Sequence, residues 1–218
     1  MLTHSGLGAS NIWEMGGLVY GNGDVEHPNL QYHFTPVFSE WQGRRLKLHQ
    51  GYQLNCDQLR PTSKGEVKLH SCDPRDRPAA HFNYLSHPHD VKELVEGLRA
   101  MEELLTQPAF DAYRGQRITP APGVTSDDDL EACVRATATT DYHPCGTCRM
   151  GDDEYAVVDQ EMQVRGIDGL RVVDASVMPN IVSGNLNAPT QMIAERAADY
   201  ILGKPQLPAQ QARFHFLQ

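Results

Sequence analysis

The sequence predicts an α+β fold, in which a largely antiparallel sheet is covered by flanking helices. Three strand-like segments follow one another between residues 30 and 70 without a helix between them, which is typical of antiparallel strands. Two amphipathic helical segments come next, and a third lies near the end of the chain. The 218 residues, 40% of them hydrophobic, fit one large domain or a domain and a half.

The strand predictions rest on alternation of apolar and polar residues. Residues 30–38 place their apolar side chains on one face and Gln31 and His33 on the other. Residues 51–59 form a second candidate strand of mixed polarity, and residues 66–70 form a third. Their succession predicts one antiparallel sheet.

The helix predictions rest on apolar spacing and on residues that begin or end helices. One helix begins near Pro88, and the hydroxyl of Ser126 is placed to cap another. A last helix is expected to begin at Pro189 or Thr190 and to end before Gly203. A strand bounded by glycines, residues 169–174, precedes it.

Charge and composition exclude several function classes. The formal net charge is −9 and no run of lysine or arginine is present, so nucleic acid is not an expected partner. No apolar stretch approaches the roughly 18 residues that cross a bilayer, and the first residues lack a signal-peptide pattern. We therefore expect a cytoplasmic protein without a transmembrane segment, with peripheral attachment at the inner face of the membrane as the alternative.

Five cysteines, an odd number, fit a reducing compartment better than a disulfide framework. Cys145 and Cys148 form a Cys-x-x-Cys motif, which could serve redox chemistry or bind zinc. A redox site needs a strand-to-helix turn, and a zinc site needs a second ligand pair at similar spacing. Neither context is evident, so incidental packing is favoured and no metal site is predicted.

The residues most suited to chemistry lie between 142 and 190. His143 can take a proton near neutral pH, although a histidine held in a loop is the alternative. Asn185 and Asn187 precede a helix, where an amide most often caps but can also bind a substrate oxygen. Asp174 either caps Ser176 or meets a cofactor hydroxyl. His33 could face a cavity, but a solvated strand histidine is the favoured alternative.

Three stretches, HPCGTCRMG, VVDQEMQVRGIDGLRVVDASVMP and SGNLNAPTQMIAERAAD, resemble the C-terminal signature of the glucose–methanol–choline (GMC) oxidoreductases. PNLQYHFTPVF and LRPTSKGEVKLHSCDPRDRPAAHFNYLSHPHD resemble the substrate domain of the same family, most closely its choline-oxidising branch. The resemblance implies an FAD enzyme that oxidises a primary alcohol, choline foremost, to an aldehyde. Another aliphatic or aromatic alcohol is the alternative substrate.

The resemblance also implies roles for individual residues. His143 matches the active-site histidine and Asn187 the second active-site position, whereas His33 matches a histidine lining the alcohol pocket. The positions matching the flavin contacts are Asp174, Ala175, Asn187, Ala188, Pro189 and Thr190.

The chain has no Gly-x-Gly-x-x-Gly turn for the ADP part of FAD, whereas family members begin with one. We therefore expect a truncated substrate-binding domain in residues 1–140, a signature segment of an incomplete FAD-binding domain in residues 141–203, and a loose tail in residues 204–218. The N-terminal FAD-binding half would then be a missing partner, carried by a separate chain in a split enzyme. A non-catalytic remnant and a Cys-x-x-Cys redox protein remain as alternatives.

Overall fold

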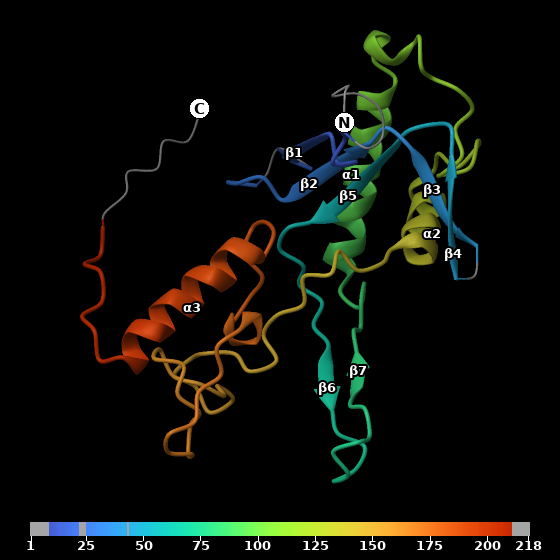
Figure 1. The fold of residues 1–218 in the computed structure, drawn as a ribbon. Coiled ribbons are helices and arrows are strands. Elements are labelled where there is room, and N and C mark those ends of the chain that lie inside the picture. Colours follow the sequence, from blue (N-terminus) through green and yellow to red (C-terminus); the bar gives the residue numbers. More distant parts are fainter. Residues whose placement is uncertain (1–8, 22–24, 43, 211–218) are drawn as a thin grey trace. The chain divides into compact units, whose positions relative to one another are not determined.

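A computed structural model describes residues 9–21, 25–42 and 44–210 of the chain. It confirms the α+β class, with antiparallel strands and three α-helices in the described part (Figure 1). The chain divides into two compact units. Unit 1 comprises residues 1–142 and 182–184, and unit 2 comprises residues 143–181 and 185–218.

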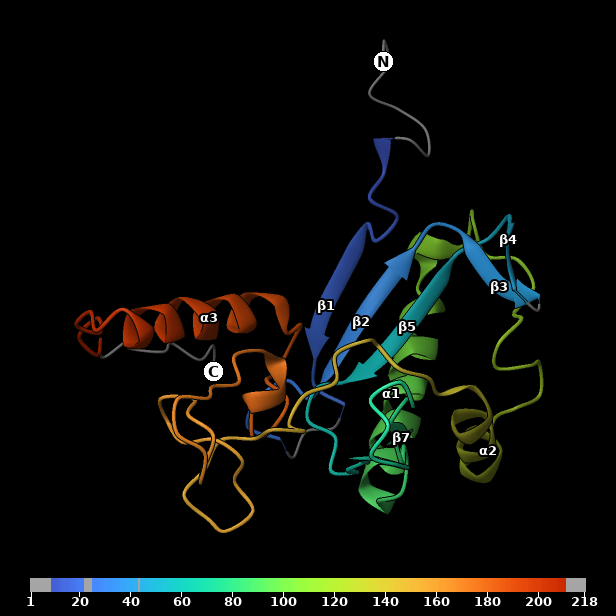
Figure 2. The ribbon, with the colours of Figure 1, turned by 60° about the horizontal axis from the view of Figure 1, so that its bottom comes forward.

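A three-stranded antiparallel sheet is the centre of unit 1. It contains β1 (Met15–Val19), β2 (Leu30–Thr35) and β5 (Gln53–Gln58), in the order β1-β2-β5. Figure 2 shows the three strands side by side with α1 behind them. The alternation predicted for β2 is confirmed, because Leu30 and Tyr32 are buried whereas Gln31 and His33 are only half-buried on the other face.

Two separate hairpins extend the strand content of unit 1. The first pairs β3 (Phe38–Gln42) with β4 (Arg45–His49), and the second pairs β6 (Glu66–Lys68) with β7 (Ala79–His81). The prediction of one continuous strand over residues 30–38 was wrong, because β2 ends at Thr35 and β3 begins a different sheet. The Thr35 hydroxyl donates to the Val37 carbonyl at this break.

Helices α1 (Pro88–Leu105) and α2 (Asp127–Thr137) pack against one another in unit 1. The predicted caps are confirmed: Pro88 is in the first turn of α1, and the Ser126 hydroxyl accepts a hydrogen bond from the Asp129 amide. The apolar stripes of the two helices meet in one core cluster, which comprises Val91, Val95, Leu130 and Val134.

A buried polar cluster joins α1 to β5. Asp90 accepts hydrogen bonds from the backbone amides of Thr62 and Ser63 and from the Gln58 side chain. Gln58 also donates to the buried Glu93, so each carboxylate removed from water receives donors in exchange. These bonds fix the start of α1 against the end of the sheet.

Unit 2 contains the long helix α3 (Asn187–Ile201) and the 3-10 helix η3 (Ala175–Val177). Its core comprises Val158, Met162, Val177 and Ala197. The strand predicted over residues 169–174 was wrong. Arg171 forms only an isolated bridge with Gln163, while Val172 and Val173 pack against the core without a strand partner. Apolar, β-branched residues therefore signalled burial here rather than a strand.

No helix in the described part of the chain combines the length and the apolar character needed to cross a membrane.

Candidate functional site

His143 and Asn185 meet in unit 2. The amide nitrogen Nδ2 of Asn185 lies 2.7 Å from Nε2 of His143. An amide nitrogen donates, so this contact is a hydrogen bond to Nε2 in the tautomer that carries its proton on Nδ1. The imidazole is half-buried and the amide is exposed, so the pair can be approached from solvent. This arrangement presents a basic nitrogen and an amide in one place.

The backbone after His143 is tied to the 3-10 helix η3. The Cys148 amide donates to the Ser176 carbonyl at 3.0 Å, and the Met150 amide donates to the Val177 carbonyl at 2.8 Å. Asp174 begins η3, and its side chain accepts a hydrogen bond from the Ser176 amide at 2.8 Å. The capping interpretation of Asp174 is therefore confirmed. Its carboxylate stabilises η3, the 3-10 helix to which Cys148 and Met150 are hydrogen-bonded.

Tyr142, the residue before His143, has a φ of +61°. A non-glycine residue in the left-handed region is uncommon and strained, and such residues gather at functional sites. The Tyr142 amide donates to the Thr140 hydroxyl at 2.9 Å, which helps to hold this turn. The backbone turn at residues 140–142, directly before His143, is therefore constrained.

Asn187 is the first residue of α3 and does not precede the helix as predicted. Helix α3 begins at Asn187 rather than at Pro189 or Thr190, and the Asn187 Oδ1 atom accepts a hydrogen bond from Gln191 at 3.1 Å. Within the described residues, the amide placed against His143 is that of Asn185. The two-residue spacing of the asparagines gives no signal in the sequence that selects one over the other.

The first turn of α3 contains Asn187, Ala188, Pro189 and Thr190, four of the positions expected at the flavin. Leu186, at the N-cap position, supplies no capping side chain within the described part of the chain. The backbone amides of a first helical turn lack partners within the helix, and the helix dipole adds positive potential there. Thr190 differs, because both its amide and its hydroxyl donate to the Leu186 carbonyl. The remaining first-turn amides suit an electron-rich group.

His33 lies on β2 in unit 1, and its Nε2 atom is 3.0 Å from Oδ2 of Asp57 on β5. The two side chains are 20% and 25% exposed, respectively. Trp13 packs edge-on against the imidazole, with ring centroids 5.4 Å apart. The solvated strand histidine is therefore not what the structure shows. The sequence could not identify Asp57 as a neighbour of His33, because their proximity depends on the β2–β5 register.

Cys145 and Cys148 are half-buried and form no disulfide bond. They lie in an irregular segment with a turn rather than at a strand-to-helix junction. The structural context of a thioredoxin-like redox site is thus not found around this motif in the described residues.

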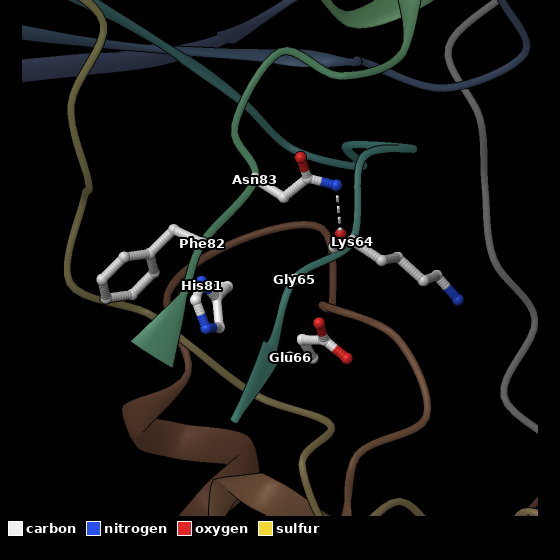
Figure 3. A pocket seen from close by; sticks show the side chains of 6 residues that line it. All are labelled: Lys64, Gly65, Glu66, His81, Phe82 and Asn83. Atoms are coloured by element: carbon white, nitrogen blue, oxygen red, sulfur yellow. Dashed lines mark hydrogen bonds between the residues drawn. The ribbon is translucent and has the colours of Figure 1, made fainter. Parts of the chain in front are cut away.

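An open pocket of about 590 Å³ lies beside the β6–β7 hairpin (Figure 3). The Asn83 amide donates to the Lys64 carbonyl across it at 3.0 Å. None of the residues expected at the active site contributes to it. Its lining comprises Lys64, Gly65, Glu66, His81, Phe82 and Asn83.

Two curated relatives are similar over almost the whole chain. An oxygen-dependent choline dehydrogenase of Escherichia coli is 47% identical over 210 residues, which is 96% of this chain and 37% of that protein. A protein of the same name from Klebsiella pneumoniae is 46% identical over 211 residues, covering 97% and 38% of the two chains. This chain thus spans somewhat more than a third of the length of the relatives it matches.

Solved structures share the same fold. A pyridoxine 4-oxidase from Mesorbium loti superposes with a TM-score of 0.77 at 25% identity, covering 88% of this chain and 38% of the other. A fungal aryl-alcohol oxidase gives 0.68 at 32% identity, covering 83% and 28%. A formate oxidase from Aspergillus oryzae, studied for modification of its FAD, gives 0.73 at 25% identity, covering 90% and 33%.

The family model described as GMC oxidoreductase matches residues 61–194. That range contains His143, Asn185, residues 148–150 and the 3-10 helix η3 to which they are hydrogen-bonded. It covers more than half of the 218 residues, and the chain therefore belongs to the GMC oxidoreductase family.

Proposed function

We propose that this chain forms the substrate-facing and flavin-facing C-terminal part of an FAD-dependent enzyme that oxidises a primary alcohol, choline foremost, to the aldehyde. The observation that carries the proposal is the contact of His143 with Asn185 at 2.7 Å. The name and 47% identity of the Escherichia coli relative support choline as the first substrate to test.

His143 is the proposed base. A carbinol carbon releases hydride readily only when its hydroxyl proton is removed or shared, and an imidazole is suited to that transfer near neutral pH. The Asn185 amide holds the ring with Nε2 as the acceptor, and the same amide can turn its donor toward a developing alkoxide. Asn185 therefore takes the partner role that the family resemblance gave to Asn187. Bound FAD would supply the acceptor of the hydride.

The proposed cofactor contacts fit unit 2. The uncapped first turn of α3 offers the amides of Asn187 and Ala188 to an electron-rich group, and Pro189 has no amide hydrogen to lose. Asp174 and Ala175 would approach the flavin's ribityl–pyrophosphate region. Since Asp174 already caps η3, its contribution there is the position of the turn as well as its charge.

We propose that residues 1–140 form the substrate-binding domain. Residues 141–203 would carry the active-site and flavin contacts, and residues 204–218 would form the tail. His33 would line the alcohol pocket within the first part.

Co-expression of the chain with a polypeptide that carries a Gly-x-Gly-x-x-Gly dinucleotide-binding half tests the proposal. Flavin absorbance in the purified complex and turnover of choline are the expected results. Turnover of a neutral primary alcohol in place of choline would revise the substrate. A folded complex that binds flavin but oxidises no alcohol would contradict the proposed function.

A further inference from the structure

Three side chains of unit 1 with metal-binding chemistry converge although they are far apart in the sequence. His33 lies on β2, Asp57 on β5, and Asp141 in the segment after α2. One potential ligand atom from each residue lies within 4.8 Å of the other two. Sequence spacing predicts no metal site here, because the grouping arises from the sheet register.

The register explains the first two positions. His33 pairs with Asn55 across the β2–β5 ladder, and Asp57 pairs with Gln31. His33 and Asp57 are therefore diagonal neighbours, and both side chains lie on the sheet face opposite to Cys56 and Tyr32. The face with Cys56 and Tyr32 packs against α1, so the cluster lies on the face that α1 does not cover.

The geometry of His33 points to a ligand atom rather than to a simple ion pair. Its Nε2 atom is shielded from solvent and makes no hydrogen bond among the described residues, although Oδ2 of Asp57 is only 3.0 Å away. With metal–ligand bonds of roughly 2.1 Å, neighbouring ligands in four- to six-coordinate sites lie about 3.0–3.4 Å apart. The 3.0 Å between Nε2 of His33 and Oδ2 of Asp57 lies within this range of ligand–ligand distances. Trp13 fixes the orientation of the ring from one side.

The charges of the cluster also favour a cation. Two carboxylates within 4.8 Å repel one another, and a divalent ion between them replaces that repulsion with attraction. Asp141 is exposed, and its ligand atom lies within 4.8 Å of those of His33 and Asp57. One imidazole and two carboxylates form a ligand set for a borderline divalent ion of the first transition row, and three protein ligands leave coordination positions open.

We propose that His33, Asp57 and Asp141 form a binding site for one divalent transition-metal ion, with Zn²⁺ as the probe. The proposal concerns unit 1 alone. It shares His33 with the proposed alcohol pocket, but its test does not depend on alcohol oxidation. It is therefore tested by metal content and spectroscopy rather than by activity.

The full chain, produced without a polyhistidine tag, is stripped with a chelator, dialysed against Zn²⁺ and analysed for bound metal. A Cys145→Ser, Cys148→Ser background removes the thiol pair of the Cys-x-x-Cys motif. One Zn²⁺ per chain is expected, and Asp57→Asn should weaken binding on the order of 10-fold or more. The matched control is His49→Gln, because His49 lies 3.0 Å from Glu40 in another histidine–carboxylate pair of unit 1. It should bind Zn²⁺ as its parent does.

Thermal unfolding with and without Zn²⁺ supplies a second readout, since a ligand of the native state raises Tm by mass action. The rise should occur in the parent and in His49→Gln, and it should be absent in Asp57→Asn. If Asp57→Asn does not fold, the Co²⁺ absorption spectrum of the parent decides, and a spectrum of nitrogen and oxygen ligation is expected. Substoichiometric metal in the parent, or equal loss of binding in Asp57→Asn and His49→Gln, would overturn the proposal.

Discussion

Nδ2 of Asn185 lies 2.7 Å from Nε2 of His143, whereas Asn187, two residues later, is bound to Gln191 within helix α3. The two asparagines therefore have different partners, although the sequence alone does not distinguish them. Asn185→Ala should therefore lower kcat of the flavin-loaded enzyme on the order of 10²-fold, as expected when a positioned donor is removed. Steady-state kinetics with choline is the measurement.

Asn187→Ala is the matched control for this prediction, and it should leave kcat close to the wild-type value. A second readout is the tautomer of His143, which nitrogen chemical shifts of the imidazole report. Wild-type protein should show the proton on Nδ1, and Asn185→Ala should show a mixture of both tautomers. Equal kinetic losses in the two variants would contradict the assignment of Asn185.

Asp90 is expected to make the protein sensitive to acid. Burial would raise the pKa of this carboxyl, but hydrogen bonds from Ser63, Thr62 and Gln58 outweigh burial and lower it. A depressed folded-state pKa stabilises the protein above the unfolded pKa of about 4, and that stabilisation is lost as pH falls through the folded value. Asp90→Asn should lower the free energy of unfolding at pH 7 by about 2–3 kcal/mol.

Urea denaturation between pH 3 and pH 7, followed by circular dichroism, tests the prediction for Asp90. The variant should lose less stability than the wild type over the acidic part of this range. Asp73→Asn is a control, because Asp73 is paired with Arg75 at the surface and little change is expected. A wild-type protein and an Asp90→Asn variant with parallel pH profiles would show that other carboxylates dominate.

The features predicted well from the sequence are those that depend on local signals. Helix α2 has an apolar stripe and the Ser126 cap, and both act over a few residues. Strand β2 has clear alternation. By contrast, β1 was not predicted, because Met15–Val19 contains two glycines and almost no alternation. It is a strand because β2 supplies its hydrogen-bonding partner.

The candidate site shows the same limit. His143 could be selected from its residue type and the motif around it, but its partner depends on where α3 begins. A helix expected to start at Pro189 leaves Asn187 in the preceding loop, whereas the observed start places it in the first turn. Asp57 and Asp141 could not be associated with His33 at all, since their proximity follows from strand register and chain path.

The thiol of Cys56 should react much more slowly than that of the exposed Cys72. Burial raises the pKa of Cys56 from 9.0 to about 12, with further contributions from Asp57 and Glu93. The thiolate is the nucleophile, and this shift lowers the thiolate population about 10³-fold at pH 8. The greater basicity of the Cys56 thiolate offsets only part of that loss. A variant that retains only Cys56 should react with a maleimide far more slowly at pH 8 than one that retains only exposed Cys72. Mass spectrometry over time measures both rates.

The raised pKa of Cys56 also has a consequence for stability. The unfolded chain releases the thiol proton near pH 9 and the folded chain does so only near pH 12. The contribution of this thiol to stability is therefore complete below pH 9 and is lost as pH rises toward 12. Cys56→Ala should flatten the alkaline part of the stability profile. Rapid labelling of Cys56 in the native protein at pH 8 would contradict both expectations.

Gly97 should resist even a one-carbon substitution. It lies in the middle of α1, where its carbonyl accepts a hydrogen bond from the Tyr32 hydroxyl at 2.8 Å. A Cβ atom at this position would lie 2.6 Å from the Cys56 sulfur and 3.0 Å from Leu30 Cδ1. Overpacking of this kind lowers the free energy of unfolding by about 1–3 kcal/mol, whereas the better helix propensity of alanine returns at most ~1 kcal/mol.

Gly97→Ala should therefore lower the urea midpoint of the chain. Gly115→Ala is the matched control, because no described atom lies within 4 Å of a Cβ at Gly115. That variant should stay within about 0.5 kcal/mol of the wild type. If Gly97→Ala is instead as stable as Gly115→Ala, α1 can move away from the sheet without loss. The buried bonds of Asp90 and Glu93 would then not fix its position.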